Sequence, residues 1–569
     1  MTSNSTAFDY SNSFSLLDHA WLPVRRADGS RNLIRPAEIT SQHDINPVIQ
    51  FAWSRADFDA ASREFLIGLL ATACGSSTGH GWHEWFVHPP VTAELDAAFA
   101  CLHNAFHLDG PGPRFMQDAE DFAGEEVSVS QLLIEAPGAN TLKKNLDHFV
   151  RRGGIDTLSR RGAAMALFAL QDFAPAGGAG HRTSLRGGGP LSTLVVPGPA
   201  EDGKPVSLWQ TLWLNTVASG FGAEDDDDLL RLDRIFPWLG STRVSEKGQT
   251  TTPDDTHPLH AYWGMPRRIR LIFEPNSYQR CCDLTGDVDS IIVRGYRTRP
   301  YGTNYSAFIH PLSPYYKAKG SAEWLPLHGQ PGRIGYRHWI GLIESREGEG
   351  RRTAEATAVA RKRLGYESPP VRERARLLAA GYDMDNMKAR DFIESEMPLH
   401  QLDGETARHF SPIIDSIVRA ADEVQRLLVR QVKDALLSRD VKIDAGPNAV
   451  ARDRFWEETE GPFHSLADEL ANELKGTGGD EARRADVQNR AKMGWLQIMR
   501  HQALQIFDDL VPSTDLATLR LTDMQKIIAA RKWLSLALAG YGKAGLAIYE
   551  KLGLNPPTTT TPRKKKEIA

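Results

Sequence analysis

Short strand-like and helix-like patterns alternate along the first two thirds of the chain. Residues 14–34 have the pattern of two strands joined by a turn at Asp28-Gly29. From Asp57 to Cys74, apolar residues recur with helical spacing. Residues 290–306 are β-branched, aromatic and arginine-bearing, which favours a strand or hairpin. These patterns predict a large mixed α/β domain over residues 1–375.

Beyond about residue 370, strand signals almost vanish and long helical patterns follow. Ser411-Pro412 is typical of a helix start, and apolar residues then recur at positions 414, 417, 421, 424, 428, 432 and 435. Further helical segments cover residues 455–474, 481–510 and 522–552, with short connections between them. The sequence therefore predicts an α+β protein with a C-terminal four-helix bundle over 376–555 and a disordered basic tail over 556–569.

Composition restricts the class of protein. The chain has 569 residues, so we expect more than one domain. Its net charge of −5 excludes attraction of the whole molecule to nucleic acid, so any such contact must be a local patch. Four cysteines without a CxxC pair fit a reducing compartment. The longest apolar run, residues 65–74, is about half a membrane span, so we expect a cytoplasmic protein with no membrane partner.

A glycine-rich stretch over residues 174–193 stands out, with six glycines around His181, Arg182 and Arg186. It follows an apolar helical segment and precedes a strand-like one. Glycines at this density suit a backbone that adopts positive φ or approaches another molecule closely. The cations among them favour an anionic polymer or a phosphate as that molecule. The alternative is an ordinary surface loop.

Motifs for catalysis or metal binding are weak. The G-x-S-x-G pattern around Ser77 follows a helix instead of the strand that a nucleophile elbow requires. His83 and His88 are one residue too far apart to share the zinc face of an H-E-x-x-H helix. Adjacent Cys281 and Cys282, with two histidines upstream, are a poor metal site. A serine or metal hydrolase is therefore a weak alternative, and we expect no enzyme activity, no cofactor and no metal.

The predicted helix after Pro412 carries a basic face opposite its apolar stripe. Its members, within about 60° of one another, are Arg419, Arg426, Arg430 and Lys433. This face could contact nucleic acid. Asp415, Glu423 and Asp434 are close enough along the helix to pair with these cations instead, so both interpretations stay open.

Several segments together resemble the CasA family, the large subunits of the type I-E CRISPR surveillance complex Cascade. The resemblance rests on SLLDHAWLPVR near the N-terminus, Ser184–Gly188 with Pro190 and Thr193, Arg294-Gly295-Tyr296, and Gly381–Asn386. They occur in the family's order and spacing, and with the predicted domains they cover nearly the whole chain.

The resemblance implies a non-catalytic subunit that works with other Cascade subunits and guide RNA. It would recognise the protospacer-adjacent motif (PAM) of double-stranded target DNA through the minor groove, promote strand opening and recruit a helicase-nuclease. The residues implied for DNA binding are the glycine loop with the nearby Arg182, a basic reader on a hairpin, and a wedge. They fall on Gly177, Gly178, Ala179, Gly180 and Arg182, on Arg297 or Arg299, and on Asp385, Asn386 and Lys388.

Two departures from the family pattern matter. The position of the family's basic reader is Pro300, so that role shifts to Arg299 or Arg297 or is absent. Only Cys281 and Cys282 remain of a family cysteine cluster, so we expect no zinc.

A mobile loop towards the guide RNA end is also implied by the resemblance, with candidates Glu135, Pro137, Gly138, Asn140, Lys143 and Lys144. A DNA-independent interaction scaffold remains an alternative.

Overall fold

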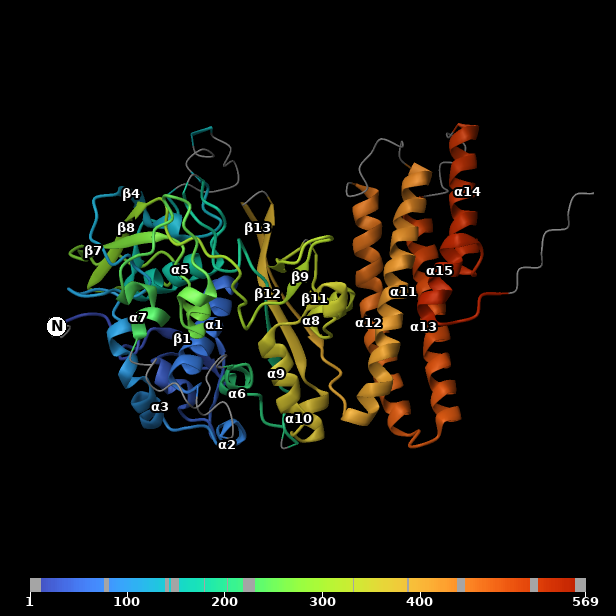
Figure 1. The fold of residues 1–569 in the computed structure, drawn as a ribbon, viewed down its shortest axis with the longest axis horizontal. Coiled ribbons are helices and arrows are strands. Elements are labelled where there is room, and N and C mark those ends of the chain that lie inside the picture. Colours follow the sequence, from blue (N-terminus) through green and yellow to red (C-terminus); the bar gives the residue numbers. More distant parts are fainter. Residues whose placement is uncertain are drawn as a thin grey trace, which may run out of the picture. The chain divides into compact units, whose positions relative to one another are not determined.

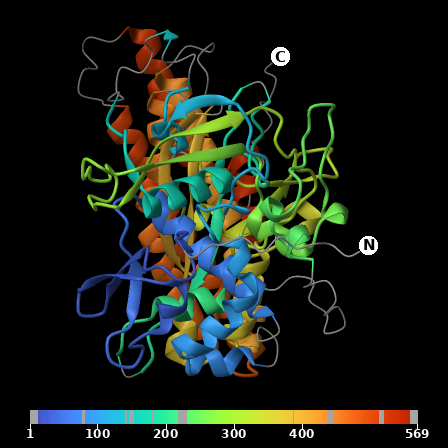
Figure 2. The same cartoon turned by 90° about the vertical axis from the view of Figure 1, so that its left-hand side faces the viewer.

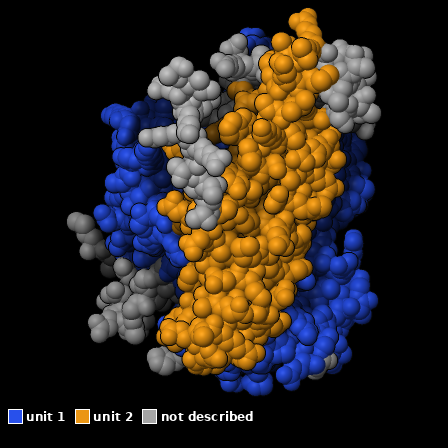
Figure 3. All heavy atoms as spheres, turned by 90° about the vertical axis from the view of Figure 1, so that its right-hand side faces the viewer, with its two compact units in different colours: residues 1–331, 341–396 blue, residues 332–340, 397–569 orange. Residues whose placement is uncertain are grey.

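The chain divides into two compact units. In this computed structural model, the described residues are 12–75, 81–138, 143–144, 153–178, 180–201, 203–217, 231–330, 332–385, 388–436, 446–511 and 520–557. The first unit consists of residues 1–331 and 341–396, and the second of residues 332–340 and 397–569. Figure 3 colours the two units separately.

The first unit contains four small antiparallel sheets. Their orders are β2-β1-β3, β10-β9-β11, β13-β12-β6 and β4-β8-β5, with β7 also paired to β8. Figure 2 shows β7 and β8 side by side as green arrows. The strands are β1 (Leu22–Arg26), β2 (Arg31–Ile34), β3 (Val48–Phe51), β4 (Glu125–Ser128), β5 (Leu158–Ser159), β6 (Ser192–Val196), β7 (Arg268–Pro275), β8 (Ile291–Arg299), β9 (Tyr315–Lys317), β10 (Trp324–Pro326), β11 (Arg351–Arg352), β12 (Arg376–Asp385) and β13 (Lys388–Pro398).

Helices of the first unit surround an aromatic core. Phe65 on α1 makes edge-on contacts with Trp21, Phe106, Phe168 and Trp263, with ring centroids 5.3–6.0 Å apart. Such edge-to-face pairs stabilise a core beyond the area that they bury. The α-helices before residue 397 are α1 (Ala56–Ala73), α2 (Trp82–Val87), α3 (Thr92–Phe99), α5 (Arg160–Phe173), α6 (Leu208–Leu214), α7 (Leu232–Ile235), α8 (Trp339–Leu342), α9 (Glu355–Leu364) and α10 (Pro369–Glu373). Of these, α8 begins in the segment 332–340 of the second unit.

Most sequence patterns of the first unit predict the observed elements. The hairpin β1–β2, the helix α1 and the strand β8 lie within the segments that the sequence indicated, although β1 begins only at Leu22 and β8 ends at Arg299. The expectation that strands vanish beyond residue 370 is wrong, because β12 and β13 follow. β12 pairs with β6 from Arg376–Val196 to Ala380–Ser192, so this hairpin belongs to the first unit. The second unit therefore resumes at Met397, about twenty residues after the predicted boundary at 375/376.

The second unit is helical, and long helices run side by side in it (Figure 1). They are α11 (Gly404–Leu436), α12 (Pro447–Lys475), α13 (Glu481–Leu510), α14 (Leu521–Leu538) and α15 (Gly542–Leu552). α11 contacts the four others, and its predicted stripe residues from Ile414 to Ala435 are all buried. A helix with neighbours on several sides needs the wide apolar face that this sequence provides.

Two helix boundaries differ from the prediction. α11 begins seven residues before Ser411, with Pro412 inside the helix, because Asp403 caps it by accepting a bond from the amide of Thr406 at 2.8 Å. The single helix expected over 522–552 is two helices, α14 and α15. Gly540 and Gly542 adopt φ of 92° and 72° between them, which ends one helix before the next begins.

No helix in the described part of the chain combines the length and the apolar character that crossing a bilayer requires.

Candidate nucleic-acid interface

The glycine-rich segment connects α5 to β6, as the sequence predicts. α5 ends at Phe173, and the amide of Gly177 donates to the carbonyl of His181 at 3.2 Å. The amide of His181 donates back to the carbonyl of Gly178 at 3.1 Å. These bonds close a tight turn, in which Gly178 and Gly180 have φ of 96° and 79°. Glycine occupies both positions because side-chain-bearing residues rarely adopt such angles.

The glycines of this turn have different surroundings. A Cβ on Gly177 would overlap Nη1 of Arg267, and one on Gly180 would lie 2.6 Å from Cβ of Pro300. A Cβ on Gly178 would meet no described atom within 4 Å. Gly177 and Gly180 therefore permit close packing inside the protein, whereas Gly178 faces open space. Ala179 lies outside the described residues.

The end of β8 packs against this turn. The amide of Tyr301 donates to the carbonyl of Gly180 at 2.6 Å. Tyr301 has φ of 63°, which is strained for a residue with a side chain, and its side chain is exposed. The structure therefore brings Pro300, where the sequence resemblance placed the basic reader, to the glycine turn.

The other end of the glycine-rich segment contacts β12. A Cβ on Gly189 would lie 2.6 Å from Cγ of Met384 and 2.9 Å from Cβ of Tyr382. Gly329 forms a bridge to Asp383 on the same strand. The glycine-rich segment thus contacts the end of β8 through Gly180 and β12 through Gly189, close to the predicted wedge. The first unit brings these three parts of the chain together although more than 70 residues separate each pair.

Arg186 anchors this segment from inside the protein. Its side chain is 1% exposed, and Nη2 donates to Glu64 at 2.6 Å and to Asp172 at 2.7 Å. Nη1 donates to the hydroxyls of Ser192 and Ser313. Arg186 is therefore not one of the cations that this stretch offers to an anionic partner. The sequence expectation for this residue is wrong because its partners come from other elements: Asp172 lies 14 residues away along the chain and Glu64 lies 122 residues away.

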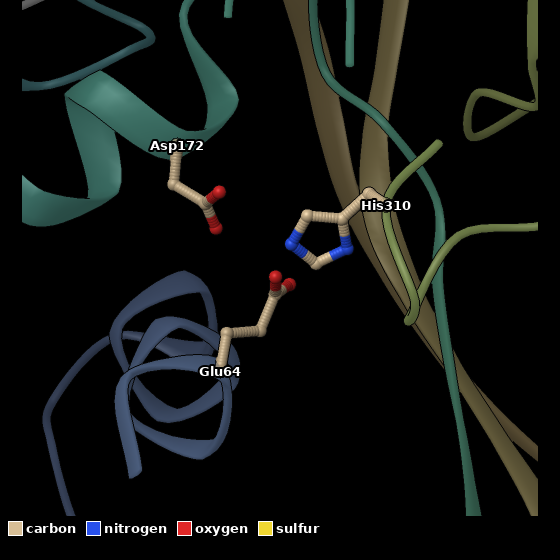
Figure 4. A group of neighbouring side chains, drawn as sticks. All are labelled: Glu64, Asp172 and His310. Carbon is tan, nitrogen blue, oxygen red and sulfur yellow. The ribbon is translucent and has the colours of Figure 1, made fainter. Parts of the chain in front are cut away.

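Glu64, Asp172 and His310 converge around the same place, and their ligand atoms lie within 4.8 Å of one another (Figure 4). Burial raises the pKa of Glu64 to about 8, against the opposing effect of Arg186. Burial lowers the pKa of His310 well below its usual value. With Glu64 protonated and His310 neutral, Arg186 and Asp172 balance each other's charge. Nη2 of Arg186 bonds to both acidic side chains of this group, so the guanidinium supplies a positive charge next to them.

The candidate DNA-binding arginines of the first unit have partners within the protein. Nε of Arg182 donates to Oγ of Ser245 at 2.9 Å, which directs its guanidinium to that loop. Arg297 lies 3.2 Å from Glu126, and Arg299 lies over the ring of Phe122 and donates to the carbonyl of Ala123. Glu126 on β4 therefore offsets part of the positive charge along β8.

The predicted wedge is at the turn between β12 and β13. Asp385 lies 3.7 Å from Arg390, which also makes a bidentate pair with Asp383. Lys388 is exposed, and Asn386 lies outside the described residues. Three residues before Asp385, the hydroxyl of Tyr382 donates to Asp57 on α1 at 2.5 Å. The hairpin is therefore tied to the core below its tip.

The predicted guide-RNA-end loop begins next to the part of the hairpin that contains Tyr382. Glu135 makes a bidentate pair with Arg55, which also pairs with Asp57. The carbonyl of Pro137 accepts a bond from Gln131, and Gly138, Lys143 and Lys144 are exposed. Asn140 lies outside the described residues. A cavity of about 270 Å³ between the loop and the hairpin is lined by Arg55, Glu135, Tyr382 and Phe392 among others.

The basic face of α11 is partly neutralised. Arg419 pairs with Asp415 at 3.0 Å, and Arg426 pairs with Asp422 at 2.5 Å and lies 3.8 Å from Glu423. Arg430 is exposed and Lys433 is half-buried. Two of the four candidates thus make the intrahelical pairs that the alternative interpretation expected.

The weak catalytic and metal motifs gain no support from the described residues. Ser77 lies outside them, and His83 faces Glu367 at 3.0 Å. Cys281 is exposed and Cys282 is buried. Their loop is fixed by ion pairs of Arg160 with Asp289 and Arg161 with Asp287. The loop that contains the two cysteines is thus stabilised by carboxylate–arginine pairs.

Arg267 and Tyr301 contact the glycine turn but were not among the residues that the sequence suggested. Arg267 follows a proline in a stretch of basic and apolar residues, and Tyr301 follows Pro300. Neither residue belongs to a motif, so the sequence could not indicate that they contact a turn about 90 or more residues away.

Comparison with known proteins connects this arrangement to a family. The family model described as CRISPR-associated protein Cse1 matches residues 15–506. CasA from Thermus thermophilus is similar in structure at 18% identity and a TM-score of 0.60, over 92% of this chain and 99% of that chain. Cse1 from Thermobifida fusca is similar at 18% identity and a TM-score of 0.62, over 95% of this chain and 99% of that chain.

A chain of a structure described as a CRISPR RNA-guided surveillance complex is also similar. It matches at 16% identity and a TM-score of 0.56, over 92% of this chain and 99% of that chain. At these identities the structural matches show a shared fold, and the family model shows a relationship in sequence.

Proposed function

Because the chain belongs to the CRISPR-associated Cse1 family, we propose that it is the non-catalytic large subunit of a type I-E RNA-guided surveillance complex. In this role it contacts other subunits, guide RNA and double-stranded target DNA. It recognises the PAM through the minor groove, promotes strand opening and recruits a helicase-nuclease after target binding.

The open backbone at Gly178 carries the proposal. It is the position of the turn where a side chain would meet nothing in the described protein, and its φ is 96°. Bare backbone can approach the edges of base pairs more closely than a side-chain-bearing residue. The minor groove distinguishes A·T from G·C pairs only coarsely, so such a contact should accept several related motifs.

The end of β8 and the β12–β13 hairpin supply the remaining parts. Arg299 or Arg297 would contact the groove or phosphates next to the glycine turn. Asn386 would enter the base stack, with Asp385 orienting it and Lys388 contacting a phosphate. Unstacking one step costs a few kcal/mol, which additional phosphate contacts offset. The ion pair of Asp385 with Arg390 supports this role, because it reduces the repulsion between that carboxylate and DNA.

Substitution of Gly178 tests the proposal. Asn tolerates positive φ better than other side-chain-bearing residues, so Gly178→Asn should preserve the turn and block close approach. We expect the assembled guide complex to lose at least about tenfold in affinity for a PAM-bearing duplex, about 1.4 kcal/mol. Filter binding or biolayer interferometry at a fixed salt concentration measures this affinity.

Gly29→Asn is the matched control. Gly29 has φ of 87° and open surroundings, but it lies in the β1–β2 turn. This variant should bind as the unchanged protein does. Unaltered affinity of the Gly178→Asn complex, with both variants assembled, would refute the minor-groove role of the turn.

A further inference from the structure

Arg267 is an arginine beneath the glycine turn that has no carboxylate partner among the described residues. Two neighbouring examples in the first unit do pair with carboxylates: Arg186 with Glu64 and Asp172, and Arg268 with Asp118. The backbone of Arg267 is fixed, because its amide donates to Gln171 at 2.9 Å and its carbonyl accepts from Gln171 at 3.0 Å. Its position under the turn is therefore determined by α5.

The guanidinium of Arg267 uses few of its five donors. Nη2 donates to the carbonyl of Pro175, where the glycine-rich segment begins. Nε is buried and has no hydrogen-bond partner among the described residues. Burial lowers the pKa of Arg267 to about 10, so the group still carries its charge at neutral pH. Burying a charged guanidinium with unused donors lowers the stability of the folded protein unless an anion compensates the charge.

The side of this guanidinium that faces the turn lies against glycine backbone. Nη1 lies where the Cβ of any other residue at position 177 would be. His181 lies close enough to Arg267 that this cation contributes to lowering its pKa, after the larger effect of burial, while Glu125 acts in the opposite direction. Arg267 itself keeps some accessible surface. An anion resting on the turn would therefore approach the guanidinium without a side chain of residue 177 between them.

We propose that Arg267 binds a backbone phosphate of the target duplex, and that this phosphate is the anionic partner which the described residues do not supply. This rests on the proposed function, because it assumes that duplex DNA lies against the glycine turn. The phosphate would sit on the turn at Gly177–Gly178, within reach of the guanidinium, whose charge would strengthen the hydrogen bonds to its oxygen atoms. Arg267 would thus set the position of the duplex on the turn, and Gly178 would contact the groove.

Arg363 shows what a purely structural arginine of similar burial looks like. Burial also lowers its pKa to about 10. Its Nη1 donates to three carbonyls at the end of α6, those of Trp213, Leu214 and Thr216, at 2.9–3.3 Å. It joins two parts of the fold and lies away from the glycine turn, so it is a matched control.

The salt dependence of DNA affinity tests the phosphate contact. Arg267→Gln keeps a donor for Pro175 but removes the charge, whereas Arg267→Lys keeps the charge. The assembled guide complex carrying each variant is titrated with a PAM-bearing duplex at several salt concentrations. We expect Arg267→Gln to weaken binding about tenfold and to reduce the slope of log affinity against log salt by about 0.9. Arg267→Lys should keep the slope of the unchanged complex.

The outcomes separate the two proposals. An Arg267→Gln complex with the slope of the unchanged complex overturns the phosphate contact, and so does an equal loss of slope in Arg363→Gln. If the Arg267→Gln variant does not assemble, the Arg267→Lys complex decides. A reduced slope in that complex overturns the phosphate contact, and the slope of the unchanged complex supports it. If the unchanged complex binds the duplex equally well without this chain, the proposed function itself fails.

Discussion

Arg186 shows what a residue's neighbours in sequence cannot reveal. Among glycines and beside Arg182, it has the sequence context of a solvent-facing cation. In the structure it is fully buried between α1, α5 and β6, because Glu64, Asp172 and Ser192 surround it. The carboxylate of Glu64, which helps decide its role, lies 122 residues away along the chain. Sequence reasoning identified the stretch but not this division of roles within it.

The glycines beside Arg186 were more predictable. Positive φ follows from the density of glycine, and the turn at 177–180 has it at Gly178 and Gly180. Which glycine faces open space could not be predicted, since it depends on Arg267 and Pro300 packing under the other two.

Glu64 gives the protein a pH-dependent stability that can be measured. Its pKa in the folded protein is about 8, above the value of about 4.5 for an unperturbed glutamate. Between these values the folded state holds a proton that the unfolded state has released. The contribution of Glu64 to the free energy of unfolding therefore falls as pH rises from about 5 to 8, by up to about 1.4 kcal/mol per pH unit.

Glu64→Gln isolates this effect, because Gln stays neutral and similar in shape. Urea unfolding of both proteins at about pH 5, 6.5 and 8 should show the variant gaining stability relative to the unchanged protein as pH rises. A difference that is constant with pH would contradict a protonated Glu64.

At the scale of elements, the β12–β13 hairpin is the part that the sequence patterns missed. β12 reads RLLAAGYDMD, and its Leu, Ala and Met residues favour helices locally. Pairing with β6 on one side and β13 on the other overrides that preference. A continuous apolar run of this length fits a buried strand or a helix equally, so periodicity could not decide. Long amphipathic helices such as α11 were predictable because their apolar stripe repeats many times.

Residues 332–340 form part of the helical unit although they precede the β12–β13 hairpin in sequence. The ring of Tyr336 stacks on Phe463 at 4.3 Å and meets Trp456 and Trp495 edge-on. Its hydroxyl lies 2.8 Å from that of Thr459, and its amide donates to Glu460. This segment thus fills the apolar side of α12.

Tyr336→Ala should therefore destabilise the helical unit by about 3–5 kcal/mol, as deletion of a buried aromatic ring does. Native-state hydrogen exchange should show faster exchange of α12 amides, while β7 and β8 amides keep their protection. Tyr316→Ala, at a half-buried position on β9, serves as the control and should leave α12 unchanged. Unaltered exchange of α12 in Tyr336→Ala would show that the segment does not stabilise this unit.

At the scale of the whole molecule, a chain of net charge −5 can bind DNA only through local surfaces. The structure restricts those surfaces further, because Arg182, Arg297, Arg419 and Arg426 all have partners within the protein. Under the proposed function, recognition of DNA therefore depends on shape and on few charges. In that proposal the open turn at Gly178 supplies the shape, and Arg267 beneath it supplies a charge.

The most direct test of the central claim is a comparison of target binding with and without this chain. The guide complex, reconstituted both ways, is titrated with duplexes that share one target and carry every dinucleotide at the PAM position. We predict that affinity varies with the dinucleotide only when this chain is present, and that several related motifs are accepted. Equal affinities with and without the chain, across all dinucleotides, would contradict the account.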